Sequence, residues 1–193
     1  MKKPIDATTL AYPVPAFAVA TYDAGGKPNV MTAAWGGICC SKPPCIAVAL
    51  RKATHSYASI VEREAFTVNI ASENQAALID YVGLVSGKNV DKFAAANLTP
   101  VKSELVDAPF VMEFPVNLEC KLIKTIEIGS HTQFIGEIVG IQADEEVLDD
   151  EDSPDIEKIK PILFGLPLPG AYYGVGKNLG RAFSIGKELK EKA

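Results

Sequence analysis

Short apolar runs rich in branched and aromatic residues recur along the chain, and glycine, proline and polar clusters separate them. Runs of this length and composition are typical of β-strands. Gly129 and Ser130 join two long runs as a hairpin. Several hairpins with few helices predict a mainly β fold, a closed or split barrel. The predicted strands cover residues 16–22, 29–38, 45–50, 66–71, 110–114, 117–128 and 132–143.

Helix-start signals follow some of the predicted strands. Thr54 is a typical N-cap residue and precedes a helical segment that ends in charged residues. Ser72, with Gln75 three positions later, has the form of a capping box before an apolar helical face in 76–85. A shorter helix is predicted at about 90–97, after the glycine that ends the longer one.

A basic corner follows the buried strand predicted at 45–50. That strand stops at Arg51 and Lys52, and two hydroxyls follow at Thr54 and Ser56. A helix N-terminus presents unpaired N–H groups and a partial positive charge, so these residues favour a site for a dianionic phosphate. A solvated basic corner beside an ordinary helix cap explains the same residues, and both interpretations stay open.

The strand before this corner carries features of a slot for a flat ligand. Small residues at 32–34 lie beside Trp35, the only tryptophan, and glycines follow at 36–37. Small residues let a ligand approach the backbone closely, where N–H and C=O groups can bind its edge. Trp35 would then wall the slot and Ser41 would add a hydroxyl. The alternative is that Trp35 is a core residue, the commoner position for an indole.

Composition and charge narrow the functions to be considered. The 193 residues suit one domain with one core, since 48% are hydrophobic and 22% are charged. A formal charge of -5 argues against nucleic acid as the main partner, because binding a phosphate backbone needs a broad basic face. No apolar segment of a signal peptide follows Lys2 and Lys3, and no run approaches a membrane span. We therefore expect a soluble cytoplasmic protein with a small phosphorylated ligand.

Four cysteines offer a second kind of chemistry. Cys39, Cys40 and Cys45 lie close together in sequence, whereas Cys120 is remote. No C-x-x-C motif is present and the chain has only two histidines, so we predict no metal site. Neighbouring residues of a strand point to opposite faces, which would separate Cys39 from Cys40. We expect all four to be small buried residues with reduced thiols, and a redox role for Cys39 or Cys40 is the less favoured alternative.

Several short motifs follow one another in a fixed order. The first is N-x-M-T-A-A-W from Asn29, the second is C-S-K-P-P, and R-K-x-T-x-S follows the strand at 45–50. Further motifs are FTVNIA at 66–71, SGK and DKF within 86–93, and H-x-x-F-I-G-E at 131–137. Their order and spacing resemble the flavin reductase-like, FMN-binding split-barrel family, and within it the flavoredoxins. The resemblance covers most of the chain.

The resemblance implies a homodimer that binds FMN non-covalently in a barrel groove. The cofactor would carry the electron chemistry, so no catalytic side chain is expected. The resemblance implies that the flavin ring lies along the 29–35 strand and that Lys92 and His131 donate to the ring or the ribityl chain. From the residues alone, a solvent-facing His131 at the hairpin tip fits equally well. The expected cofactor-binding residues are Asn29, Met31, Thr32, Ala33, Trp35, Ser41, Arg51, Lys52, Ala53, Thr54, Ser56, Lys92, His131 and Phe164.

The end of the chain consists of short apolar pieces interrupted by proline and glycine. Such pieces bury themselves poorly. We therefore expect residues 160–193 to be an extension of a single 1–193 domain that packs at the dimer interface, with Phe164 reaching the flavin of one subunit or the other. The last residues, 187–193, are expected to form a charged helix end.

Three functions fit these expectations. The first is an FMN-bound electron-transfer protein of flavoredoxin type, with an electron donor and acceptor that the sequence leaves open. The second is an NAD(P)H-dependent flavin or ferric reductase. The third is a non-redox flavin-binding module. The chain lacks a Rossmann G-x-G-x-x-G motif, but split-barrel reductases do not need one, so its absence does not separate the first two.

Overall fold

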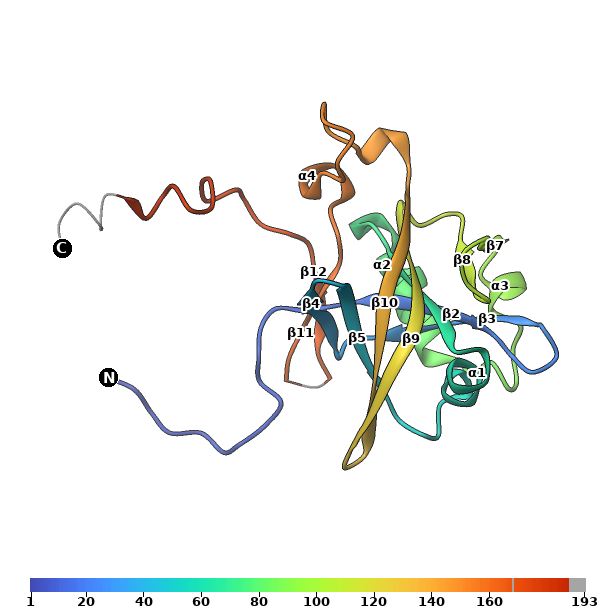
Figure 1. Cartoon of the computed structure of the whole chain (residues 1–193). Helices are drawn as coiled ribbons and strands as arrows, with labels where there is room; N and C mark the ends of the chain where they lie inside the picture. Colours follow the sequence, from blue (N-terminus) through green and yellow to red (C-terminus); the bar gives the residue numbers. More distant parts are fainter. Residues whose placement is uncertain (168, 188–193) are drawn as a thin grey trace.

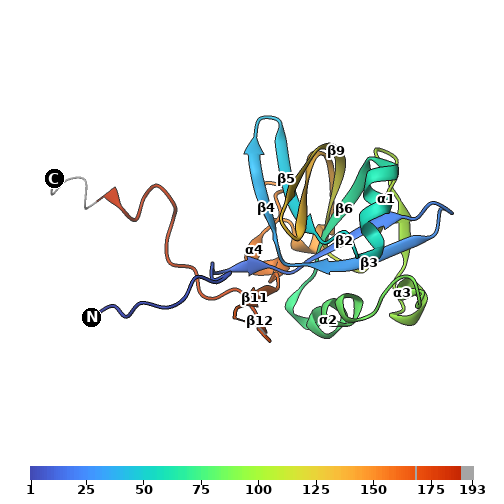
Figure 2. The same cartoon turned by 90° about the horizontal axis from the view of Figure 1, so that it is seen from below.

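The computed structural model describes residues 1–167 and 169–187. Figures 1 and 2 show strands gathered into one body, from which both chain ends extend in the same direction. Apart from Lys187, the helix end expected at 187–193 lies outside the described residues. No helix within the described ranges is both long and apolar enough to cross a membrane.

A seven-stranded antiparallel sheet forms the body. It curls so that its two edges approach each other: the strand at one edge ends at Ala33, and only Ala34 and Trp35 separate it from the strand at the other edge, which begins at Gly36. A Cβ on Gly36, in the strand at the other edge, would lie 3.2 Å from the Phe17 ring. The mainly β fold is therefore confirmed, and the sheet edges approach each other as in a split barrel. The strand order is β3 (Pro28–Ala33), β2 (Phe17–Tyr22), β6 (Ala65–Ile70), β9 (Val116–Ile128), β10 (His131–Ala143), β5 (Pro44–Leu50) and β4 (Gly36–Ser41).

Alternation along the strands produces two hydrophobic clusters. Val19 of β2 belongs to the cluster inside the barrel, together with the fully buried rings of Phe66 and Phe134. Its neighbours Ala18 and Ala20 belong to the second cluster, which includes residues of the helices. Successive side chains of a strand point to opposite faces, so one strand serves both clusters. This packing fixes β2 and β3 between the barrel and the helices.

The first helix, α1 (His55–Arg63), follows β5 as predicted, with Thr54 at the N-cap position. The Thr54 hydroxyl donates to the Arg51 carbonyl at 2.9 Å and does not cap the helix. The first N–H groups of α1 therefore receive no side-chain acceptor from the N-cap residue. This matters for the site because such groups attract anions.

The other helices lie along the second cluster. Ser72 and Gln75 form the predicted capping box at the 3-10 turn η1 (Glu73–Gln75), which leads directly into α2 (Ala76–Leu84). The predicted short helix is α3 (Lys92–Ala95), which begins where the Asp91 side chain accepts from the N–H of Ala94. The shorter elements at the barrel ends are β7 (Pro100–Lys102), β8 (Pro109–Val111), η2 (Glu145–Val147), α4 (Ile156–Ile159), and the small sheet of β1 (Val14–Pro15), β11 (Leu163–Gly165) and β12 (Ala171–Tyr173).

Two expectations about the first hairpins are wrong. The strand expected at 29–38 is two strands, β3 and β4, because the backbone leaves β3 at Trp35 to pair with β5. Cys39 and Cys40 are exposed, whereas Cys45 and Cys120 are buried as expected. β4 is an edge strand, and the pairing passes from Ile38–Ile46 directly to Cys40–Cys45, so Cys39 is an extra residue in a β-bulge.

Candidate functional site

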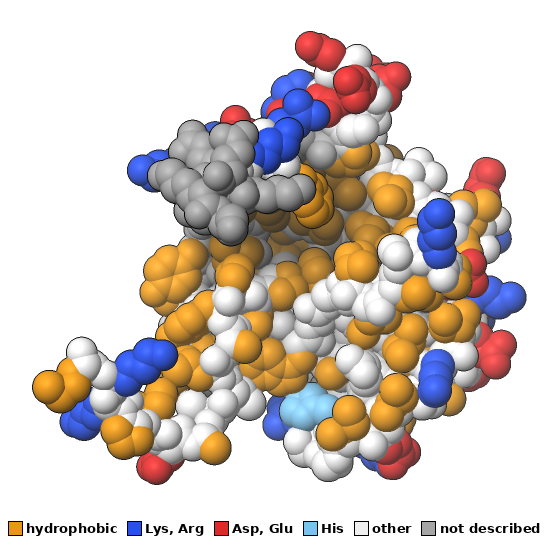
Figure 3. Space-filling view, turned by 60° about the vertical axis from the view of Figure 1, so that its left-hand side comes forward, with side chains coloured by type: hydrophobic (Ala, Val, Ile, Leu, Met, Phe, Trp, Pro, Cys, Tyr) orange, Lys and Arg blue, Asp and Glu red, His pale blue; other side chains and the backbone are white. Residues whose placement is uncertain are grey.

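Three hollows lie along β3 and the turn that follows it. The small cavity, about 160 Å³, lies between Asn29, the start of α1 and residues 83–87. The middle cavity, about 360 Å³, shares Gly83 and Leu84 with the first and extends to Phe164. The large cavity, about 560 Å³, lies beside Trp35. Figure 3 shows hydrophobic side chains gathered around a hollowed face of the molecule.

The polar end of this row is the small cavity. The Asn29 side-chain amide donates to the Ser56 hydroxyl at 2.8 Å, and both residues are buried. The bond ties β3 to the first turn of α1. Thr54 and His55 also line the cavity, so it opens onto a helix N-terminus with its partial positive charge. A phosphate-sized anion suits such an end.

Gly87 keeps the small cavity open. A Cβ at this position would lie 2.1 Å from Oδ1 of Asn29 and 2.6 Å from the His55 ring. Distances this short cannot be accommodated without moving one of these side chains. Any larger residue at 87 would therefore disturb the Asn29–Ser56 pair that shapes the cavity.

Lys92 supplies a buried cation to the same cavity. Its side chain is only 4% exposed, and its ammonium group donates to the Val82 carbonyl at 2.6 Å. Burial lowers the pKa of Lys92 from 10.5 to about 8. No salt bridge to Lys92 occurs within the described residues. A buried cation without an anionic partner favours a negatively charged ligand.

The expected basic corner is only partly assembled. Lys52 pairs with Glu127 at 2.8 Å, and this hydrogen bond raises the pKa of Lys52. The Lys52 side chain is 62% exposed, and the residues at 51 and 53 are exposed too. None of these residues lines the small cavity, whereas Thr54 and Ser56 do. Ser41, at the exposed end of β4, lines none of the three cavities.

The three expected ligands in the middle of β3 have different surroundings. The Thr32 hydroxyl donates to the Ile79 carbonyl of α2, and its side chain lines the middle cavity. Met31 lines the small cavity. Ala33 is 5% exposed and packs in the barrel cluster, so its side chain does not reach a cavity.

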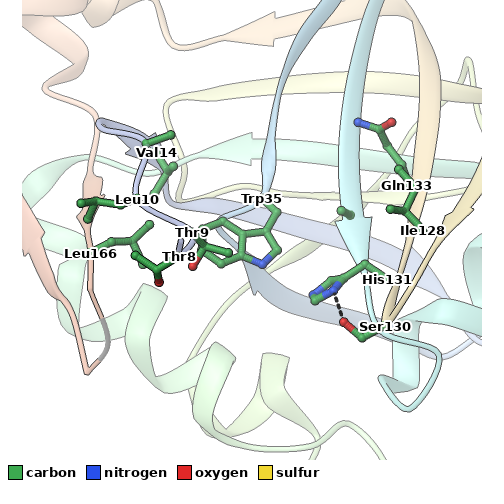
Figure 4. A pocket seen from close by; sticks show the side chains of 12 residues that line it. Thr8, Thr9, Leu10, Val14, Trp35, Ile128, Ser130, His131, Gln133 and Leu166 are labelled. Carbon is green, nitrogen blue, oxygen red and sulfur yellow. Dashed lines mark hydrogen bonds between the residues drawn. The ribbon is translucent and has the colours of Figure 1, made fainter. Parts of the chain in front are cut away.

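Trp35 and His131 line the large cavity from different elements, as Figure 4 shows. Trp35 lies between β3 and β4, and its ring is directed toward the space between Leu166 and His131 in Figure 4. Nδ1 of His131 shares a 2.9 Å hydrogen bond with the Ser130 hydroxyl. Trp35 is therefore half-buried beside a cavity rather than a residue of either hydrophobic cluster.

Phe164 reaches the middle cavity from β11. Its ring lies 5.6 Å from that of Tyr172, whose hydroxyl donates to Oδ1 of Asp80 at 3.0 Å. Burial, with the Asp80 hydrogen bond, raises the pKa of Tyr172 to about 12. The phenol therefore stays protonated and links the C-terminal strands to α2. Tyr172 and Asp80 are 92 residues apart in sequence, so no local motif predicts their hydrogen bond.

The site also contains residues that sequence reasoning missed. Gly83 and Leu84 end α2 and Gly87 follows it; all three line the small or middle cavity, and Asp80 and Tyr172 complete the middle one. The glycines gave a usable signal, because a glycine after a helix marks either a stop or a close approach. Within the described ranges, no group of three or more His, Cys, Asp or Glu residues could hold a metal ion.

Comparison with known protein families identifies the class of protein to which the chain belongs. The family model described as "Flavin reductase like domain" matches residues 9–172. The chain therefore belongs to the flavin reductase-like family.

Two solved flavoredoxins are similar over nearly the whole chain. The flavoredoxin of Desulfovibrio vulgaris (Miyazaki F) is 55% identical, with a TM-score of 0.91 over 96% of this chain and 100% of that one. The flavoredoxin of Methanosarcina acetivorans is 31% identical, with a TM-score of 0.89 over 98% and 100%. An uncharacterized protein of Archaeoglobus fulgidus is 34% identical over 60% of this chain, and the match spans 65% of that protein.

Proposed function

We propose that this protein is an FMN-binding redox protein that carries electrons through its cofactor. The observation that carries the proposal is the row of three cavities along β3, with Lys92 at the polar end and Trp35 at the apolar end. A flavin mononucleotide has the same polarity, since an anionic phosphate and a flat aromatic ring lie at its two ends. Membership of the flavin reductase-like family and the likeness to two flavoredoxins support the same ligand.

The phosphate end of the ligand would lie at the start of α1. Ser56 and Thr54 offer hydroxyls there, beside the helix N–H groups. Arg51 and Lys52 are close in sequence and would add charge from the outside, although Lys52 must first leave Glu127. Asn29 and Gly87 fix the width of this end.

The ring would follow β3 toward Trp35, with Met31, Thr32 and Phe164 beside it. Bound FMN would supply the electron chemistry, because it exchanges one or two electrons without a catalytic acid or base from the protein. The task of the chain is then to bind, orient and tune the cofactor. At the polar end, the ammonium of Lys92 would favour the negative charge of the phosphate, whereas His131, beside Trp35, is a candidate donor to the ring.

The same proposal includes a homodimer. Both ends of the chain leave the body in Figures 1 and 2, and several of their apolar side chains are exposed. Phe183 is 100% exposed and Leu179 is 79% exposed. In a homodimer these segments would pack on the other subunit, and the open side of the large cavity would be covered. Sedimentation that gives the mass of a single chain would contradict this part.

The cofactor part is tested with one glycine and its control. Gly87→Ala places a Cβ against Asn29, so we expect FMN affinity to fall at least tenfold in a fluorescence-quenching titration. Gly176→Ala is the matched control, because a Cβ there would meet no atom within 4 Å. Equal affinities for the two variants would contradict the placement of the ligand in the small cavity.

A second candidate function is reduction of FMN by NAD(P)H. The large cavity favours it, because about 560 Å³ beside Trp35 and His131 leaves room for a second flat ring. The test is an anaerobic titration of the FMN-loaded protein with NADH and with NADPH. Rapid bleaching supports a reductase, and a spectrum that persists supports a carrier that receives electrons from another donor.

A further inference from the structure

The end of the β4–β5 hairpin brings three thiols together. Cys40 and Cys45 are register partners across the hairpin, and Cys39 is the bulged residue before them. Cys39 and Cys40 are exposed, whereas Cys45 is 2% exposed. A bulge turns two successive side chains away from strict alternation, which explains how Cys39 and Cys40 both lie near Cys45. The prediction that the two side chains point to opposite faces assumed a regular strand, which the bulge interrupts.

The Cys40–Cys45 pair has the geometry that a disulfide requires. Directly opposed residues of an antiparallel ladder have Cα atoms about 4.5–5.5 Å apart. Disulfides span Cα separations of roughly 4.4–6.8 Å, so register partners lie within the range that a disulfide bridges. The Cys40 thiol is near enough to raise the pKa of Cys45, whose own thiol donates to the Pro43 carbonyl at 3.4 Å. Both thiols are free, and so is every cysteine of the chain.

Cys40 and Cys45 differ in their exposure to solvent, as the attacking and the resolving cysteine of a dithiol couple do. Cys40 lies on an edge strand and is open to solvent. Cys45 lies inside the sheet, and burial, with the nearby Cys40, Cys39 and Glu137, raises its pKa. An incoming disulfide therefore meets Cys40 first. Cys45 is shielded from reagents but adjacent to whatever forms on Cys40.

Cys39 has a different role in the structure. Its thiol donates to the backbone carbonyl of Cys45 at 3.6 Å, and it has no register partner in β5. The bulge therefore leaves Cys39 exposed but tied to the backbone. This makes Cys39 a natural control for the pair beside it.

We propose that Cys40 and Cys45 form a reversible dithiol–disulfide couple that exchanges with disulfide compounds. The Cys40 thiolate attacks one sulfur of a disulfide, forms a mixed disulfide and releases one thiolate. The Cys45 thiolate then attacks the Cys40 sulfur, forms the Cys40–Cys45 bond and releases the second thiolate. The two protons lost by the cysteines go to the two released thiolates, and two electrons reduce the compound. This couple is a second two-electron site and does not depend on the proposed flavin.

The test measures mass rather than activity. The protein as purified is incubated with glutathione disulfide, quenched with acid, alkylated under denaturing conditions and weighed intact. We expect wild type to lose two alkylatable thiols without gaining a glutathionyl group, and Cys39→Ser to behave in the same way. Cys40→Ser should not form the internal bond, and Cys45→Ala should stop at a glutathionyl adduct. Dithiothreitol should restore both thiols of the wild type.

Two results would overturn the proposal. One is a wild type that carries glutathionyl groups on exposed thiols and never forms an internal bond. The other is loss of the internal bond in Cys39→Ser, which would assign it to Cys39. Cys45→Ala keeps a small apolar side chain in the sheet, and its circular dichroism is compared with wild type. If Cys45→Ala does not fold, Cys40→Ser and Cys39→Ser still test which cysteine forms the internal bond. Both substitutions change exposed residues and leave the buried core intact.

Discussion

Replacing Lys92 by methionine removes a buried charge while keeping a side chain of similar length. Burial lowers the pKa of Lys92 from 10.5 to about 8, a difference that corresponds to about 3 kcal/mol. Because the small cavity beside the ammonium group admits water, we take about half of this, ~1–2 kcal/mol, as the penalty of keeping the charge in the folded protein. Loss of the hydrogen bond to Val82 changes the free energy of unfolding of Lys92→Met by the same amount at every pH.

The sign follows from proton binding in the two states. Between about pH 8 and 10.5 the unfolded chain holds the proton on Lys92 and the folded chain has released it, so stability rises with pH. Urea unfolding of FMN-free protein at pH 7, 8.5 and 10 measures the difference between wild type and Lys92→Met. We expect this difference to move in favour of wild type by ~1–2 kcal/mol as pH rises.

A matched control and a ligand titration complete the test. Lys88→Met removes an exposed lysine from the adjacent segment, and its difference from wild type should stay level over the same range. FMN affinity of wild type should fall as pH rises through about 8, because Lys92 loses its charge, and Lys92→Met should bind weakly without this step. A Lys92→Met curve parallel to wild type in both measurements would refute the account of Lys92.

Three further changes test other parts of the site. Tyr172→Phe removes the hydroxyl bound to Asp80, so we expect FMN affinity to fall several-fold by fluorescence titration, while Tyr173→Phe at a 60% exposed residue leaves it unchanged. Trp35→Ala should weaken FMN binding at least tenfold in equilibrium dialysis, and Lys52→Ala, at an exposed residue, should weaken it less. A larger loss of affinity in Lys52→Ala than in Trp35→Ala would contradict this prediction. Tyr57→Phe loses the 3.1 Å hydrogen bond to Thr132 and should lower the free energy of unfolding by about 1 kcal/mol in urea; an unchanged midpoint would show that the bond contributes nothing.

Local sequence patterns predicted most of the elements. The strand at 45–50, the helix after Thr54 and the capping box at Ser72 each depend on residues within a few positions of one another. The long hairpin of β9 and β10 was predicted for the same reason, because its turn residues lie between two apolar runs. These elements can be predicted because residues close in sequence specify them, without information about contacts between distant segments.

The remainder depends on contacts between distant parts of the chain. Trp35 breaks the predicted 29–38 strand because its carbonyl pairs with Ala49. Lys52 turns from the expected phosphate site because Glu127 lies beside it at the end of β9. Ala33 was predicted among the cofactor-binding residues because it is small, and its side chain packs in the barrel core against residues of other strands. No pattern within a single segment contains this information.

The measurement that tests the central claim most directly is the visible spectrum of the purified protein, followed by reconstitution of the stripped protein with FMN. We predict a yellow protein whose bound flavin spectrum returns on titration and saturates at one FMN per chain. A colourless protein that leaves the absorbance and fluorescence of added FMN unchanged would contradict the proposed cofactor site.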